Sequence, residues 1–375
     1  MLDRNPKTHF PLAGELAYLD TAAEGLPAPG CEEALRAYWR EKCRGALGLE
    51  HYFQTQLETE DAVARMLGGQ AEDVVLLANA SEPLNVLANS IDWHPGDRVL
   101  VTDLEFPSGV LPWLRMKPLG VEVEVVPTEK GEVELAQFQS RITEKTRVVL
   151  VSQVSYKSGT QIRFLRELAE VTHRAGGILC VDATQAMGRV PVSAQGIDFL
   201  VASSYKWLLG SHGLGIVYCA PSLRQRFLPS TVGWWSVQDL FSPHRFERFS
   251  RTDGARSWQP GMPNFPAIYA LKAGIEYLLH IGVERIEQEL RPLVVELREG
   301  LQDLGADLLT PRDPRYASGI VSFAHKRAEA IGAALGQAGV VVWVGDGRVR
   351  ASIHVYNDDS DVQRCLEALR PIISS

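Results

Sequence analysis

Two short apolar runs near the middle of the chain, each ending in polar residues, constrain the fold more than any other feature. Residues 178–181 are apolar and lead to Asp182, and residues 199–202 are apolar and lead into a segment that contains Lys206. Short apolar runs of this kind suit strands that are buried on both faces of a sheet. Open α/β sheets bind their ligands at the carboxyl ends of the strands. We therefore expect Asp182 and Lys206 to border one ligand site.

The remaining sequence alternates strand and helix patterns, which predicts an α/β fold with a large, mainly parallel, doubly wound sheet. The predicted strands of this sheet also include residues 73–79, 98–103, 121–127, 147–155 and 215–220, and the predicted helices include 29–42, 53–67 and 163–175. Residues 267–280, 293–300 and 361–369 are expected to be helical, and residues 318–323, 340–344 and 348–353 to be strands.

The length of 375 residues suits two domains with separate cores. We expect a large domain over residues 15–260, joined to an N-terminal arm (1–14), and a smaller C-terminal α+β domain over residues 261–375.

Composition narrows the function classes. The net charge of −8 argues against a nucleic-acid partner, and no apolar stretch approaches the roughly 20 residues that span a membrane. The five cysteines are scattered without CxxC or Cys/His spacing, so no metal site is expected. Cys180 and Cys219 lie in apolar runs and are expected to be inert core thiols. Because the N-terminus lacks the apolar centre of a signal peptide, the expected compartment is the cytoplasm.

The polar residues after the two central runs suit chemistry on a pyridine ring. A lysine amine can form a Schiff base with an aldehyde cofactor, and a carboxylate can keep a pyridine nitrogen protonated. An amide can also bind the ring's phenolic oxygen. Lys206, Asp182 and Gln185 are the candidates for these three roles.

At these residues the chain resembles a known family. The segments VDATQAMG and SSYKWLLG are similar to those of the class V, fold-type I pyridoxal 5′-phosphate enzymes. That group includes class V aminotransferases, cysteine desulfurases, isopenicillin-N-epimerase-like proteins and kynureninases. The resemblance begins at Tyr18 and extends almost to the C-terminus, so it implies fold type I for nearly the whole chain.

The resemblance implies a phosphate site at the turn after the strand at 73–79. Ala80 and Ser81 stand where relatives bind phosphate at a helix N-terminus, which offers free N–H groups. The alternative is that Ser81 is a plain N-cap, and we expect Ser81 to begin a helix as its cap in either case. Ser203 and Tyr205 are the other implied phosphate ligands, and Tyr205 replaces a histidine of many relatives.

Two further residues are implied in contacts with the ring and the substrate. Phe106 stands where relatives place an aromatic side chain flat on the cofactor, and the alternative is a core phenylalanine. Arg350, in the segment VRASIHVYN, stands where relatives bind the substrate α-carboxylate. A guanidinium fork matches a carboxylate well, although a structural salt bridge is the alternative.

The resemblance also implies a homodimer with active sites at the interface. The segment 259–265 resembles a loop that reaches the phosphate of the neighbouring subunit, with Met262 in place of a threonine. Residues 221–258 read as irregular and aromatic, and either contact substrate or a subunit or form a packed aromatic cluster. The run GSHGLG lacks the glycine order of a dinucleotide site and precedes a strand, so we reject NAD binding.

A small-molecule amino acid is the expected substrate, and class V transamination is the expected reaction. A cysteine desulfurase needs a cysteine shortly before the arginine, but residues 342–348 contain none. The alternatives are an epimerase, for which His51, His212 or His354 would supply a second acid, a C–S lyase, or a catalytically inactive interaction protein with the same fold.

Overall fold

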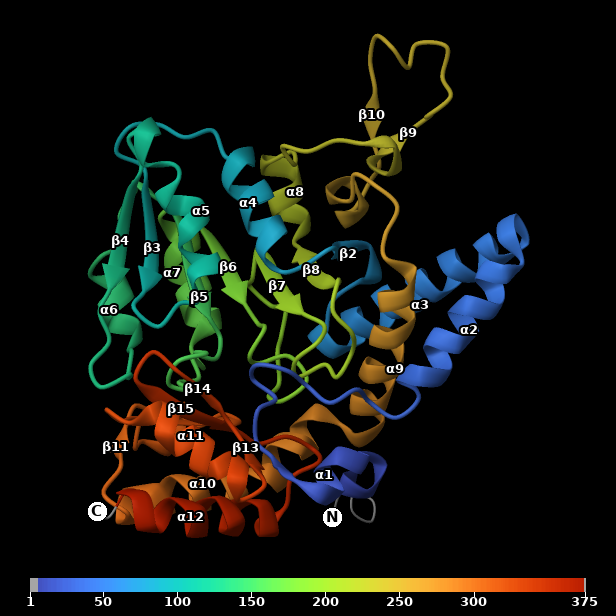
Figure 1. The fold of residues 1–375 in the computed structure, drawn as a ribbon. Coiled ribbons are helices and arrows are strands. Elements are labelled where there is room, and N and C mark those ends of the chain that lie inside the picture. The colour runs from blue at the N-terminus through green and yellow to red at the C-terminus, as the bar shows by residue number, and fades with distance from the viewer. Residues whose placement is uncertain (1–5, 374–375) are drawn as a thin grey trace.

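The fold is described from a computed structural model, in which residues 6–373 are placed. Its main element is a seven-stranded sheet with the order β2-β8-β7-β6-β5-β3-β4 (Figure 1). These strands are β2 (Val74–Leu77), β3 (Arg98–Thr102), β4 (Glu122–Val126), β5 (Thr146–Ser152), β6 (Ile178–Asp182), β7 (Phe199–Ser203) and β8 (Gly215–Cys219). Only β8 runs antiparallel to its neighbours. The predicted mainly parallel α/β sheet is therefore confirmed.

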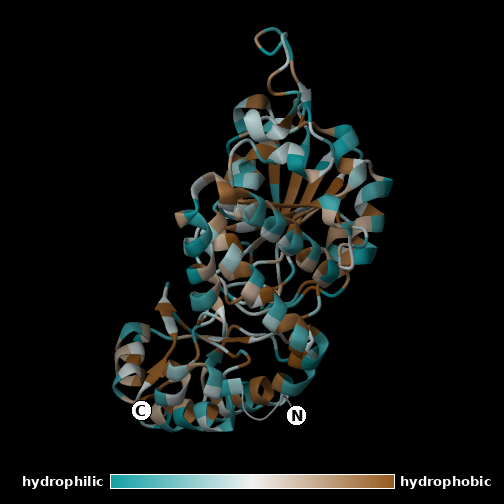
Figure 2. Cartoon of the chain, turned by 90° about the vertical axis from the view of Figure 1, so that its right-hand side faces the viewer, coloured by the Kyte–Doolittle hydropathy of each residue, from teal (hydrophilic) through white to brown (hydrophobic). Residues whose placement is uncertain are grey.

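Helices cover this sheet and bury its apolar strands (Figure 2). The shorter ones are α4 (Ser81–Ser90), α5 (Leu111–Leu114), α6 (Leu135–Gln139), α7 (Leu165–Arg174) and α8 (Pro221–Arg226). The longer helices α2 (Cys31–Cys43), α3 (Leu49–Leu67) and α9 (Phe265–Ile281) pack against one another (Figure 1). Cys180 and Cys219 are fully buried in this core, as predicted.

A smaller antiparallel sheet has the order β11-β12-β15-β14. Its strands are β11 (Asp307–Leu308), β12 (Ile320–Ala324), β14 (Trp343–Gly345) and β15 (Arg348–Ser352), and α10 (Val283–Asp303), α11 (Ala328–Gln337) and α12 (Asp359–Ile373) accompany them. Helix α1 (Pro11–Glu15) precedes β1 (Ala17–Tyr18), which pairs with β13 (Val340–Val341). Both ends of the described chain lie at this smaller sheet (Figure 1).

The domain division near residue 260 stays a prediction. Helix α9 follows that position yet packs against α2 and α3, whereas β1 precedes it yet pairs with a strand of the C-terminal part. The chain therefore crosses between the two sheets more than once.

The structure corrects several local predictions. The segment 221–258 is not irregular throughout, because it contains α8 and a hairpin of β9 (Val237–Gln238) and β10 (Ser250–Arg251) that projects from the body (Figure 1). The strand predicted over 340–344 is split into β13 and β14, which pair with different partners. Helix α2 begins at Cys31 because Gly30 adopts a left-handed conformation with φ of 90°.

No helix among residues 6–373 is long and apolar enough to cross a membrane.

Candidate functional site

A cavity of about 80 Å³ lies at the carboxyl ends of β6 and β7. Asp182 is the last residue of β6, Ser203 is the last of β7, and Lys206 follows three residues later. The cavity is lined by Ala80, Ser81, Phe106, Ser108, Ser152, Val154, Tyr156, Asp182, Thr184, Gln185, Ser203, Tyr205 and Lys206. The structure thus brings together every residue that the sequence assigned to cofactor binding. Arg350 does not line this cavity.

Asp182 is a buried acid with few protein partners. Its Oδ1 accepts a hydrogen bond from Thr184 N at 2.8 Å. Burial raises the pKa of Asp182, and the hydrogen bonds from Thr184 and the charge of Lys206 oppose this shift. A buried carboxyl group with free acceptor capacity suits a ring N–H.

Lys206 supplies a partly buried amine to the cavity that Asp182 also lines. Its Nζ makes no hydrogen bond or ion pair with any of residues 6–373, and lies 5.8 Å from the centre of the Phe106 ring. Burial lowers the pKa of Lys206, and the charge of Asp182 opposes this effect. A lowered pKa increases the fraction of neutral, nucleophilic amine.

Gln185 is held in place by the protein itself. Its Oε1 accepts a hydrogen bond from Trp207 Nε1 at 2.6 Å, and its Nε2 donates to the carbonyl oxygen of Ala22 at 3.0 Å. A side-chain amide has two N–H donors, so one of them remains available to a ligand. The segment that contains Ala22 also contacts the backbone beside Lys206, because Gly25 N donates to Tyr205 O at 2.9 Å.

The capping of the first turn of α4 differs from the prediction. Ser81 is not the N-cap: Asn79 Oδ1 accepts from Ser81 N at 3.0 Å and from Glu82 N at 2.8 Å. The Ser81 hydroxyl instead bonds the Ser108 hydroxyl at 2.8 Å. Asparagine competes well as a cap because its side-chain oxygen reaches the first free N–H groups. The backbone N–H groups of Ser81 and Glu82 are therefore already bonded, and the hydroxyls of Ser81 and Ser108 are the groups that a ligand could bind at this end of the cavity.

Phe106 is not a core residue. Phe106 is 43% exposed, and its ring meets the Tyr156 ring edge-on with 5.0 Å between the ring centres. The two aromatic side chains form one wall of the cavity. The alternative that Phe106 packs in the core is therefore wrong.

Arg350 lies next to the cavity, behind Tyr156. Its Nη1 donates to the Tyr156 carbonyl oxygen at 3.0 Å, and its Nη2 lies 3.8 Å from Asp20 Oδ1. Burial lowers the pKa of Arg350 to about 10, and Asp20 opposes this shift. The long ion pair leaves donors of the guanidinium free, so both the substrate role and the structural role stay open.

The histidines named as possible second acids do not line the cavity. His354 is buried, and burial lowers its pKa to about 3, so it is neutral at physiological pH. His51 is exposed and lies 3.6 Å from Glu41. His212 is the nearest to the site, because its ring stacks on Tyr205 at 4.1 Å and its Nε2 lies 3.0 Å from Glu24 Oε2.

Sequence reasoning missed the cavity residues Ser108, Ser152, Val154, Tyr156 and Thr184. Ser152 ends β5 and lies opposite Asp182 in the strand register. The predicted strand ran on to residue 155, so the sequence did not place Ser152 at a strand end. Tyr156 follows that strand in a turn, where its direction could not be read from periodicity.

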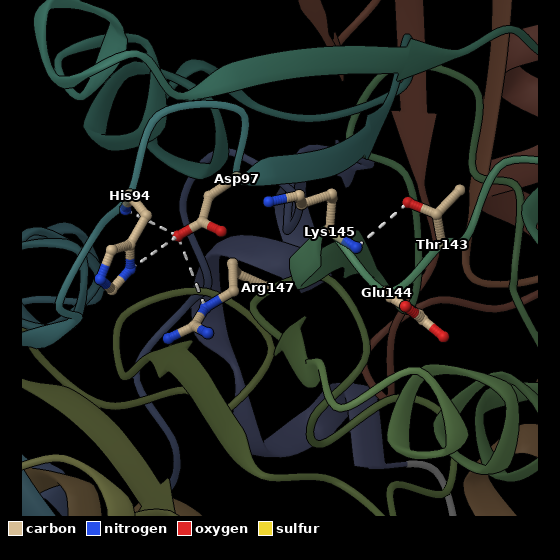
Figure 3. A pocket seen from close by; sticks show the side chains of 6 residues that line it. All are labelled: His94, Asp97, Thr143, Glu144, Lys145 and Arg147. Atoms are coloured by element: carbon tan, nitrogen blue, oxygen red, sulfur yellow. Dashed lines mark hydrogen bonds and ion pairs between the residues drawn. The ribbon is translucent and has the colours of Figure 1, made fainter.

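A larger cavity of about 750 Å³ lies at the opposite ends of the strands, near the starts of β3 and β5 (Figure 3). Its Asp97 carboxylate lies 3.8 Å from His94 and 3.7 Å from Arg147, so the charge of Asp97 is already paired within the protein. Size alone therefore does not locate the functional site.

The small cavity fits pyridoxal 5′-phosphate in its chemistry. It combines an unpaired amine on Lys206 with a buried carboxyl group on Asp182. The hydroxyls of Ser203 and Tyr205 make no hydrogen bond with another described residue, so both can bind a phosphate.

Comparisons with known proteins agree with this geometry. The family model Aminotransferase class-V matches residues 17–365. A probable cysteine desulfurase of Methanothermobacter thermautotrophicus is 28% identical over 99% of this chain and 98% of its own length. An uncharacterized aminotransferase of Bacillus subtilis is 26% identical over 96% of this chain and 95% of its own length. The apo structure of a cysteine desulfurase from Thermococcus onnurineus superposes with a TM-score of 0.91 and 28% identity, covering 100% of this chain and 98% of that one. Matched in sequence over almost its whole length, the chain belongs to the class V aminotransferases, which are fold-type I enzymes that use pyridoxal 5′-phosphate.

Proposed function

We propose that this protein is an aminotransferase that acts on a small α-amino acid through Lys206. The observation that carries the proposal is the unpaired Lys206 amine across one small cavity from the buried Asp182 carboxyl group. Pyridoxal phosphate, when bound, supplies the aldehyde carbon that the amine attacks and a ring that accepts electrons released at the substrate Cα.

Each residue of the cavity has a proposed task. Lys206 Nζ would hold the cofactor and, once the substrate has displaced it, would move the Cα proton as a general base. Asp182 would keep the ring nitrogen protonated, and the second N–H of Gln185 would bind the ring oxygen. Ala80, Ser81, Ser203 and Tyr205 would hold the phosphate, and Phe106 would contact the ring. Arg350 binds the substrate carboxylate with its free donors.

The lining of the cavity favours chemistry that uses a single base. Among the described residues that line it, Lys206 supplies the only amine and Asp182 the only carboxyl group, and the phenols of Tyr156 and Tyr205 are the remaining candidate acids. Epimerisation would need one of these phenols as a second acid at the substrate Cα. Transamination would need Lys206 alone to move protons.

C–S bond cleavage is the second candidate, because relatives named as cysteine desulfurases match nearly the whole chain. A persulfide-forming reaction is not favoured, because none of the five cysteines lines the cavity. Cys365 is buried in α12, and burial raises its pKa to about 12. A lyase that releases the sulfur product directly would need no cysteine.

We also propose a cytoplasmic homodimer. Free thiols on all five cysteines suit a reducing compartment, and the loop at 259–265 exposes Met262 for contact with a second subunit.

The deciding experiment has two stages. Purified protein is incubated with pyridoxal phosphate and reduced with borohydride, and peptide mapping is expected to find the cofactor on Lys206. Failure to trap it there would favour an inactive interaction protein with this fold. The holoenzyme is then given amino acids with and without an oxo acid. Amino transfer to the oxo acid supports transamination, whereas oxo acid, ammonia and a free thiol from one substrate support C–S cleavage.

A further inference from the structure

We propose that Arg348 and Arg350 together select amino acids that carry a second carboxylate. This inference rests on the proposed function, in which Arg350 binds the α-carboxylate. Arg348 would then bind the carboxylate of the side chain, so that acidic amino acids, or a disulfide-linked amino acid with two carboxylates, are the favoured substrates.

The two arginines point from the same face of one strand. They stand two residues apart on β15, and side chains at this spacing share a face. Trp343 of β14 lies opposite Arg350 in the register, and Gly345 lies opposite Arg348. The centre of the Trp343 ring is 4.7 Å from the Arg348 guanidinium carbon and 5.1 Å from that of Arg350. One indole therefore supports both cations.

Both guanidinium groups are buried, and each has an N–H donor that finds no hydrogen-bond acceptor in the described part of the chain. Arg348 and Arg350 are each 3% exposed, and the Nε of each has no hydrogen-bond partner among residues 6–373. Arg348 Nη1 donates to Asp346 Oδ2 at 2.6 Å, but this carboxylate is largely exposed at the surface turn. A guanidinium has five N–H donors, and burying unpaired donors is costly. A ligand with two carboxylates would supply the missing acceptors.

The arginines adjoin the cavity of Lys206 through Tyr156. The Arg348 guanidinium carbon lies 5.3 Å from the centre of the Tyr156 ring, and Arg350 binds the Tyr156 carbonyl oxygen. Tyr156 itself lines the cavity. The Arg348 partner Asp346 is exposed to solvent, and the Arg350 partner Asp20 is half-buried and 3.8 Å away. Because solvent screens an exposed ion pair, a dianionic substrate would gain more from these two buried cations than a neutral substrate would.

The first test compares dicarboxylic substrates with their uncharged amides in the holoenzyme. Glutamate, aspartate and cystine are expected to have higher kcat/KM than glutamine and asparagine. The variant Arg348→Met keeps an apolar stem against Trp343 and is expected to lower kcat/KM for the dicarboxylates by about 30-fold or more. Its kcat/KM for the amides should fall by a clearly smaller factor. Arg370→Met, at an exposed site in α12, is the matched control.

The second test needs no cofactor chemistry. Glutarate is expected to raise the melting temperature of the Lys206→Ala protein more than butyrate does, and the double variant with Arg348→Met should lose this difference. Arg348→Lys serves if Arg348→Met does not fold, and should weaken glutarate binding because lysine lacks the planar fork. Equal losses for acids and amides, or no preference for glutarate, would overturn the inference. The borohydride test bears on the proposed function, because it asks whether Lys206 carries the cofactor. The glutarate test bears on the arginine pair, so a failure of one test can be told from a failure of the other.

Discussion

Arg350 and Asp20 form a partly buried ion pair, with 3.8 Å between Nη2 and Oδ1, that links the small sheet to the segment beside Lys206. Asp20 also forms a β-bridge with Ser352, at the end of the strand that carries Arg350. The substrate carboxylate and the Asp20 carboxylate would therefore compete for one guanidinium. Whether Asp20 is charged decides how strongly it competes.

This competition predicts a pH dependence of substrate binding. Burial raises the pKa of Asp20 to about 7, although Arg350 opposes the shift. The carboxyl group is thus mainly neutral below pH 7 and charged above it. We expect KM for the amino acid to rise as the pH passes upward through about 7, and the variant Asp20→Asn to remove this rise. Steady-state kinetics of both proteins from pH 6 to 8.5 would check this, and an unchanged profile in Asp20→Asn would contradict it.

Replacing Arg350 should separate substrate binding from cofactor binding. Arg350→Ala is expected to weaken amino-acid binding by about 30-fold or more, because it removes the guanidinium group that would bind the substrate carboxylate with two hydrogen bonds. Pyridoxal phosphate affinity should change far less, since Arg350 does not line the cavity. Spectral titration with each ligand measures both constants, with Arg370→Ala as the exposed control. Equal losses of both affinities would indicate a structural role.

Removing the Lys206 amine should abolish covalent attachment of the cofactor without unfolding the protein. Lys206→Ala is expected to lose the visible absorbance of the lysine-bound cofactor while its circular dichroism stays that of the parent. The Lys206 amine makes no hydrogen bond or ion pair with residues 6–373, so its loss costs no such contact. Lys145→Ala, which changes an exposed lysine, should keep the absorbance. Survival of the absorbance in Lys206→Ala would show that another amine carries the cofactor.

Glu105 should make the protein less stable as the pH rises. Its carboxyl group accepts hydrogen bonds from Thr102 and Ser152, each at 2.6 Å, and burial raises its pKa to about 7. Because the folded state binds this proton more tightly than the unfolded state, the stabilisation is complete below the unfolded pKa and is lost as the pH rises through about 7. The loss is on the order of 3 kcal/mol. Glu105→Gln, which keeps a neutral side chain, should flatten the change, as urea unfolding at pH 5 and 8 would reveal.

A methyl group at Gly25 should disturb the site without touching the cavity. A Cβ at this position would overlap the backbone carbonyl of Lys206. We expect Gly25→Ala to cost about 1–3 kcal/mol of unfolding free energy and to weaken cofactor binding. Gly336→Ala is the matched control, because its Cβ meets no atom within 4 Å and alanine favours its helix by about 0.5–1 kcal/mol. Similar stability in the two variants would argue against a tight contact at Gly25.

The sequence was sufficient to predict those residues of the site that lie at or just after the ends of strands. Asp182 and Ser203 end apolar strands, and Lys206 follows soon after, so the parallel sheet alone brings them together. Tyr156 and Ser108 were missed because they lie in a turn and a short 3-10 helix, where side-chain direction follows backbone geometry that no periodicity encodes. The N-cap was assigned to Ser81 because serine is a good cap, but the helix begins at Ser81 and the Asn79 side chain accepts from its first N–H groups. The hairpin of β9 and β10 was missed because its two-residue strands are too short to show alternation.

The contacts of segment 17–25 limit the order in which parts of this protein can fold during synthesis. Strand β1 needs β13, and Asp20 needs Ser352, before Ala22 and Gly25 are held against Gln185 and Tyr205. On the ribosome the large sheet can assemble once β8 has emerged, yet residues 17–25 must wait for β13 and β15, which are made much later. A nascent chain that stops before β15 would therefore display its lysine and its acid on a finished sheet, with one side of the cavity still open to water.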